Sequence, residues 1–104
     1  MTTSDVTLSG LKTSLAKSEP PEGLAPPLQA LWWAAKGDWD KAHHLVQDEN
    51  DRNAAWVHAY LHRVEGDRPN ADYWYRQARR PSAQDAFDAV WDTIAGALLR
   101  APAK

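Results

Sequence analysis

The fold is decided by one stretch of the chain, AAWVHAYLHRVEGDRPNADYWYRQARR, which occupies residues 54–80. Its centre is the pair Gly66-Asp67, which has helix-forming residues on both sides. Glycine adopts a positive φ without steric cost and so ends a helix, and an aspartate side chain accepts hydrogen bonds from the free amides that begin the next one. We therefore expect a helix over about 53–65 and a GDRPN turn in which Asn70 is a further candidate cap. The second helix has four inward residues: Ala71, Trp74, Tyr75 and Ala78.

The same stretch interleaves three Tyr, two Trp and two His with charged residues. This mixture is typical either of the wall of a binding site or of packing among short helices, and packing explains most of it, because large rings fill the space between helical layers. Four rings are expected in the core: Trp56, Tyr60, Trp74 and Tyr75. The helical period places Val57, Leu61 and Val64 toward the core as well. It leaves His58, His62 and Glu65 as a polar stripe.

The pattern occurs twice, at an offset of 29 residues. Four residues of the first copy match the second: Ala30, Gly37, Asp38 and Ala42 align with Ala59, Gly66, Asp67 and Ala71. The first helix of this copy should begin at Pro26 or Pro27, because proline suits a first helical turn, and should end at Gly37. Asp38 should cap the next helix. The inner face of that helix holds Trp39, Ala42, His43 and Val46.

The two ends of the chain carry weaker signals. Residues 1–25 predict an arm that is weakly helical or mobile, because the prolines of residues 18–27 exclude a helix there. Within the arm, four apolar residues would form a short amphipathic helix capped near Ser4 or Asp5: Val6, Leu8, Leu11 and Leu15. At the other end, Ser82 with Asp85 resembles a capping box for a last helix. Its apolar face holds Phe87, Val90, Trp91, Ile94 and Leu98.

No segment alternates with the period of a β-strand, so the predicted fold class is all-α, with a single helical domain over residues 26–104. Composition agrees with one modest core: the chain has 104 residues, of which 43% are hydrophobic. Six Trp and a single Phe mean that indole rings supply much of its bulk. Cys is absent, which excludes disulfides, thiolate metal sites and cysteine nucleophiles.

Charge and hydropathy exclude two further classes of partner. The formal net charge is −2, and Lys and Arg balance Asp and Glu along the chain, so no basic field marks nucleic-acid binding. No apolar run is long enough to span a membrane, and the first residues lack the pattern of a signal peptide. We therefore expect a cytoplasmic protein. Arg76, Arg79 and Arg80 could pair with an acidic stripe on the last helix, within the chain or across a homodimer: Asp85, Asp88 and Asp92.

Beyond the turns, both copies share the placement of small and aromatic residues. In the second copy Trp56 lies near the start of a helix, Ala59 lies within it, and Ala71 and Tyr75 follow the turn. In these features residues 26–80 resemble a pair of tetratricopeptide repeats, and the segments KGDWDKAH and YLHRVEGDRPNADYWYRQA are also similar to those of a compact bacterial family. The resemblance implies two antiparallel helix-turn-helix units, a capping last helix, and a groove for a protein or peptide partner. The residues implied to line the groove are Gln29, Trp33, His58, His62, Arg63 and Glu65.

The sharpest chemical pattern is His58-x-x-x-His62 followed by Glu65. On a helix these side chains fall within about 60° of arc, so they could bind a divalent metal such as zinc, with His43 from the neighbouring helix as a further ligand. The pattern lacks the Glu of the His-Glu-x-x-His motif, so no hydrolytic reaction is indicated. Alternatively these histidines are packing residues with hydrogen-bonded rings. The sequence therefore favours a helical interaction module to which no catalytic activity is assigned, with a metal-binding or His-dependent enzyme as the alternative.

Overall fold

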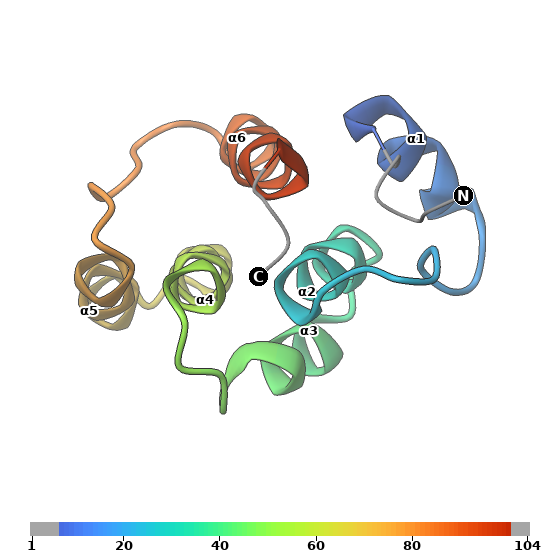
Figure 1. Cartoon of the computed structure of the whole chain (residues 1–104). Helices are drawn as coiled ribbons and strands as arrows, with labels where there is room; N and C mark the ends of the chain where they lie inside the picture. Colours follow the sequence, from blue (N-terminus) through green and yellow to red (C-terminus); the bar gives the residue numbers. More distant parts are fainter. Residues whose placement is uncertain (1–6, 101–104) are drawn as a thin grey trace.

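The computed structural model describes residues 7–100, and it is helical throughout this range apart from turns and connections. The elements in chain order are α1 Leu8–Thr13, the 3-10 turn η2 Ser14–Ala16, α2 Pro26–Ala35, α3 Trp39–Val46, α4 Arg52–Glu65, α5 Arg68–Ala78 and α6 Phe87–Arg100. No strand occurs within residues 7–100, so the all-α prediction is confirmed for the described chain. In Figure 1 most of these helices are seen close to end-on.

The two Gly-Asp turns have nearly identical backbones. Gly37 has φ +88° and Gly66 has φ +92°, both in the left-handed region that glycine tolerates. The following residues, Asp38 and Asp67, have φ/ψ of −101°/77° and −98°/79°, and their side chains cap α3 and α5 by accepting the Lys41 and Asn70 amides. The repeat thus holds at the level of the turn. Asn70 is not the cap that it was expected to be, because Asp67 already fills that position.

Helix α4 is the centre of the molecule. It packs against α2, α3, α5 and α6 (Figure 1). Nine consecutive residues, Ala54–His62, are buried. The expected division into an apolar face and a polar stripe is therefore wrong for this helix: His58 and His62 are only 4% and 6% exposed, whereas Val64 is 39% exposed. Because neighbouring helices enclose Ala54–His62, this part of α4 has no solvent face on which to display polar residues.

Residues 7–25 lie against the helical body. Helix α1 packs on α6, and Leu11 is fully buried. The buried Ser14 hydroxyl accepts a 2.9 Å hydrogen bond from the indole N–H of Trp32, which ties η2 to α2. The cap of α1 is Thr7, whose hydroxyl accepts from the Gly10 amide at 2.9 Å. The candidate caps Ser4 and Asp5, like Val6, lie outside the described residues.

The approach to α6 differs from the predicted capping box. Ser82 donates a 2.7 Å hydrogen bond to Asp72 on α5, and α6 begins only at Phe87, so Ser82 does not cap it. Asp92 forms a 2.8 Å ion pair with Lys12 of α1 instead of with an arginine. The apolar face of α6 is otherwise as expected. Phe87 is the exception, because its ring is 42% exposed beneath the guanidinium of Arg63.

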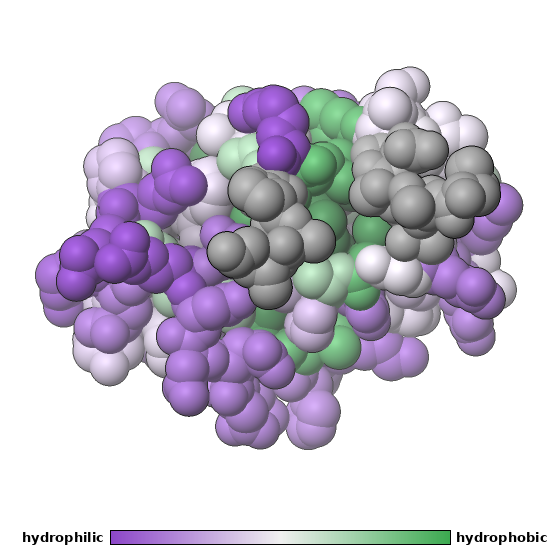
Figure 2. Space-filling view, in the orientation of Figure 1, coloured by the Kyte–Doolittle hydropathy of each residue, from purple (hydrophilic) through white to green (hydrophobic). Residues whose placement is uncertain are grey.

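The surface in the same orientation is largely hydrophilic (Figure 2). Apolar residues gather in a band between α6 and α1 that continues toward α2. A hollow of about 330 Å³ is lined by residues of α1, α2, α4 and α6, among them the Lys12–Asp92 ion pair and the buried Tyr60 and Trp91. Within residues 7–100, no helix combines the length and the apolar character that crossing a bilayer requires.

Candidate metal centre

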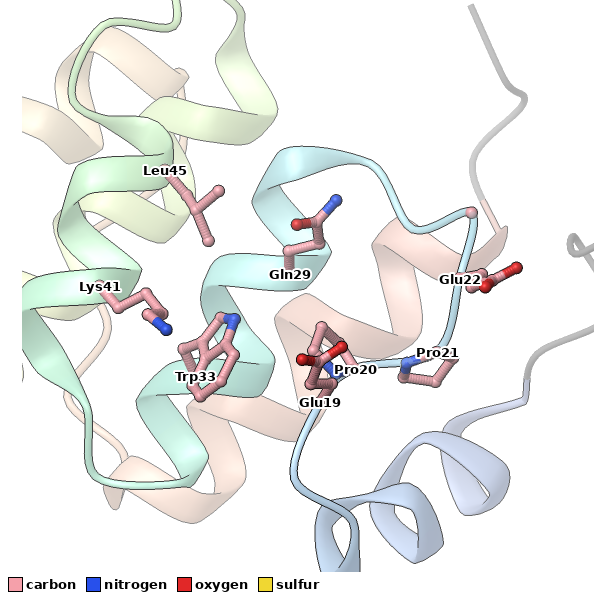
Figure 3. Close-up of a pocket in the computed structure, with 9 residues that line it drawn as sticks. Glu19, Pro20, Pro21, Glu22, Gln29, Trp33, Lys41 and Leu45 are labelled. Carbon is pink, nitrogen blue, oxygen red and sulfur yellow. The ribbon is translucent and has the colours of Figure 1, made fainter.

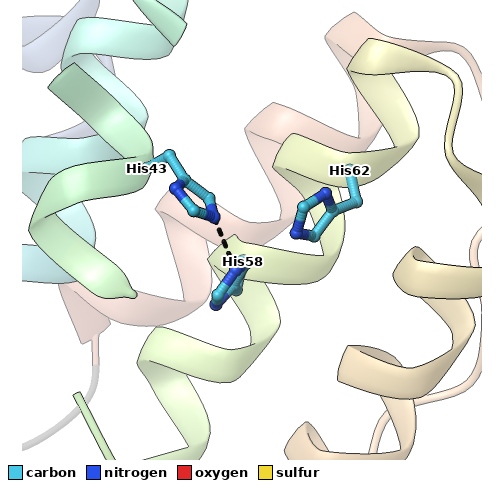
Figure 4. A group of neighbouring side chains, drawn as sticks. All are labelled: His43, His58 and His62. Atoms are coloured by element: carbon cyan, nitrogen blue, oxygen red, sulfur yellow. Dashed lines mark hydrogen bonds between the residues drawn. The ribbon is translucent and has the colours of Figure 1, made fainter. Parts of the chain in front are cut away.

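Three histidines from two helices converge beside α4. His43 comes from α3, and His58 and His62 come from successive turns of α4 (Figure 4). The Nε2 atoms of His43 and His58 are 2.9 Å apart, which is hydrogen-bonding distance. Each of the three rings offers one nitrogen, and these atoms all lie within 4.8 Å of one another. The structure therefore brings together the three histidines that the sequence nominated as metal ligands.

Helix geometry explains why these rings meet. His58 and His62 are four residues apart on α4, so their rings lie one above the other, with centroids 4.9 Å apart. His43 reaches them because α3 packs on α4, and Trp39 fixes that packing through a 2.7 Å hydrogen bond from its indole N–H to the Leu61 carbonyl. One turn along α3 from Trp39, the ring of His43 meets both α4 rings edge-on, with ring centroids 4.6 Å from His58 and 5.4 Å from His62.

Two tryptophans hold the imidazoles in orientation. Trp39 stacks on His43 with ring centroids 4.7 Å apart and meets His62 edge-on at 5.8 Å. Trp74, from α5, stacks on His58 at 4.0 Å with the planes only 13° apart. Stacked rings of this kind resist rotation, so the histidines are positioned before any ligand arrives. Neither tryptophan was assigned to the site from the sequence, although both lie at positions whose inward direction was predicted.

Burial favours the neutral forms of His43 and His58. Desolvation, with the neighbouring His43 and His62, lowers the pKa of His58 from 6.5 to about 4. Burial likewise lowers the pKa of His43, with a contribution from His62 in the same direction. His58 also has a buried Nδ1 with no hydrogen-bond partner. An unsatisfied buried polar atom is costly, but Nδ1 is not the atom that would bind a metal, because the His58 nitrogen that faces His43 is Nε2.

Glu65 lies behind the cluster as the partner of His62. Its Oε2 is 2.7 Å from Nδ1 of His62, which leaves Nε2 of that ring as the free donor atom. His62 and Glu65 also form a second group of potential ligands with Asp67, but the Asp67 carboxylate is the cap of α5. In metal sites a ligating histidine commonly donates its other N–H to a carboxylate, which fixes the ring and raises its basicity. Glu65 matches that supporting role, whereas the sequence had nominated it as a ligand.

The distances suit a small divalent ion. Four tetrahedral ligands at 2.0–2.1 Å from Zn²⁺ lie about 3.3 Å apart, between the 2.9 Å and 4.8 Å that bound the separations in this cluster. To ligate through Nε2, the rings of His43 and His58 would exchange their mutual hydrogen bond for two metal–nitrogen bonds.

The other predicted groove residues lie elsewhere. Gln29 and Trp33 line a separate hollow of about 360 Å³, with Lys41 and Leu45 of α3 opposite them and residues 19–23 along one edge (Figure 3). The amide of Gln29 is committed to the Leu24 carbonyl at 2.6 Å. Because His58 and His62 are buried, the structure does not join all of the expected groove residues into one surface. A peptide partner for this hollow stays a prediction.

Comparison with known proteins gives no match to a family model, a curated protein or a solved structure. The tetratricopeptide resemblance and the bacterial family therefore stay predictions.

Proposed function

We propose that this protein binds one divalent transition-metal ion, of the Zn²⁺ class, through His43, His58 and His62. The observation that carries the proposal is the convergence of three imidazole nitrogens within 4.8 Å, from two different helices. Imidazole is a ligand that suits zinc, copper and nickel, and a site without thiolates or ligating carboxylates does not select calcium or magnesium.

The state of the ligands supports the same conclusion. A metal ion needs neutral imidazoles, and protons compete with it only below the pKa of each ring. Because the pKa of His58 is about 4, protons do not compete for this ring at neutral pH. The Glu65 carboxylate at Nδ1 of His62 supplies the supporting hydrogen bond that such ligands usually have.

A bound ion would also join two parts of the fold. His43 belongs to the α2/α3 pair, and His58 and His62 belong to the α4/α5 pair. Because its ligands come from both helix pairs, the ion would bind only when the two pairs are packed together. Binding to the folded state alone raises the free energy of unfolding, by about 2.7 kcal/mol when the free metal is at 100 times its Kd.

The test is a zinc titration of chelator-treated protein, followed by calorimetry and by the imidazole signals in NMR spectra. We expect one ion per chain and shifts confined to His43, His58 and His62. His43→Ala is the informative variant because this residue is only half-buried, so the protein should fold without it. We expect its affinity to fall by more than about 100-fold, since even supporting partners of metal ligands are worth 10- to 100-fold.

The matched control is His44→Ala. His44 is the next residue on α3, is exposed, and has only a 3.4 Å contact with Gln47. This variant loses the same chemical group from the same helix and should bind zinc like the parent protein. Equal zinc affinity in the parent, His43→Ala and His44→Ala proteins would rule out the proposed site.

A further inference from the structure

The cluster contains three ligand residues and no fourth. Among residues 7–100, no other His or carboxylate joins His43, His58 and His62 within the 4.8 Å that these atoms span. The nearest carboxylate, Glu65, is already hydrogen-bonded to the far nitrogen of His62. Structural zinc sites are closed by four protein ligands, whereas sites with three protein ligands keep a position for water or another exogenous ligand.

Resting on the proposed metal site, we infer that the bound ion keeps a fourth coordination position open, and that this position takes water or a small monodentate anion. The charge of the ligands sets the preference for an anion. Three neutral imidazoles leave the whole charge of a divalent ion in place. The carboxylates nearby are not in the group of three ligands: Glu65 acts through the back of His62, Asp67 caps α5, and Asp40 acts on His43 through its charge. In surroundings that are largely apolar and aromatic, this charge attracts an anion more strongly than it would in water.

Access to the position is limited by the rings around it. Trp39 covers a face of His43, and Trp74 covers a face of His58, so two sides of the cluster are closed by flat aromatic walls. His58 and His62 are buried, whereas His43 is half-buried and is therefore the most exposed of the three residues. We expect a ligand of two or three atoms to reach the position beside these rings, and a bulky carboxylate to be kept out by them.

The same charge acts on water held in this position. A zinc ion with three histidine ligands lowers the pKa of its bound water to about 7, so hydroxide would occupy the position in mildly alkaline solution. Anion and hydroxide then compete for one site. The apparent affinity for the anion should fall about tenfold for each pH unit above the pKa of the bound water, because one proton is exchanged for each anion bound.

The test uses the full chain loaded with Co²⁺, whose visible absorption reports the number and type of its ligands. Sodium azide is the probe, and benzoate is its bulky counterpart. We expect four-coordinate Co²⁺ bands, a saturable change with azide, a weakening of azide binding with rising pH, and no change with benzoate. The His44→Ala protein should respond like the parent.

Two other outcomes separate the inference from the function on which it rests. If four-coordinate bands appear, require His43, and respond to neither azide nor pH, metal binding stands and the open position is refuted, because a fourth protein ligand must close the site. If no such bands appear, or if they are equally strong in the His43→Ala protein, the metal site itself fails and the open position fails with it.

Discussion

The buried imidazole of His58 should make this protein less stable as the pH falls from 6.5 toward 4. The pKa of His58 is 6.5 in the unfolded chain and about 4 in the folded one, because burial and the facing rings of His43 and His62 disfavour its charged form. The unfolded chain therefore binds a proton between these pH values and the folded chain does not. Stability is complete above pH 6.5, falls as the pH decreases toward 4, and then levels off.

The magnitude follows from the two pKa values. At 1.36 kcal/mol for each pKa unit, the difference between 6.5 and about 4 corresponds to about 3 kcal/mol in the limit of low pH. Between pH 7 and pH 4.5 the linkage relation gives a loss of about 2 kcal/mol from His58 alone. This is a large part of the roughly 5–15 kcal/mol that stabilises a typical domain.

The perturbation that isolates this effect is His58→Phe. Phenylalanine keeps a flat ring against Trp74, which stacks on His58 at 4.0 Å, but it cannot take up a proton. Urea unfolding would be followed by Trp fluorescence at pH 7 and pH 4.5, in chelator, for both proteins. Each protein is compared with itself, so the intrinsic effect of the substitution cancels.

We expect the parent protein to lose about 2 kcal/mol more than His58→Phe between the two pH values. Carboxylates that titrate in this range act on both proteins and drop out of the difference. His43, whose pKa burial also lowers, remains in the variant. Equal losses in the two proteins would refute the argument that His58 is held neutral by burial.

Three further predictions rest on other contacts. Glu65→Gln should weaken zinc binding by 10- to 100-fold, because it replaces the carboxylate behind His62 with a neutral amide, and competition with a coloured chelator measures this affinity. The metal-free variant should be nearly as stable as the parent protein in urea unfolding. Gly37→Ala and Gly66→Ala should each lower the free energy of unfolding by about 1–2 kcal/mol, and by similar amounts, because both residues have positive φ values (+88° and +92°) and no atom lies near the added methyl group. A large difference between the two variants in urea unfolding would contradict the equivalence of the turns. Leu11→Ala should lower the free energy of unfolding by about 2–5 kcal/mol, as measured by thermal unfolding, because Leu11 is fully buried. A negligible change would mean that α1 is not part of the core.

Local chemistry made much of this fold predictable. The turns at Gly37 and Gly66 were predictable because two adjacent residues determine them: glycine allows the positive φ, and the aspartate that follows caps the next helix. The meeting of His58 and His62 with His43 was also predictable, since it needs only helical spacing and one neighbouring helix. Each of these predictions depends on interactions within a few residues or between adjacent elements.

The errors came from longer-range packing. The sequence divided α4 into an apolar face and a polar stripe, because a single helix shows only its own periodicity and not the number of its neighbours. Ser82 was assigned to the start of α6, whereas its hydroxyl donates to Asp72 ten residues earlier. The ring partners of the histidines, Trp39 and Trp74, could be recognised as inward residues, but which ring each would cover depends on how three helices pack.

The enclosure of α4 decides how far this chain can be divided. Repeat proteins in which each unit contacts only the next can lose an end unit and keep the remainder folded. Here α4 contacts α2, α3, α5 and α6, so removing the α2/α3 pair would expose Ala54–His62 to water, and removing the α4/α5 pair would expose the faces of α2, α3 and α6 that α4 covers. Truncated halves should therefore be unfolded or aggregated, and the intact chain should unfold in a single cooperative step. Although its turns repeat, the whole bundle is the smallest part of this chain that should fold on its own.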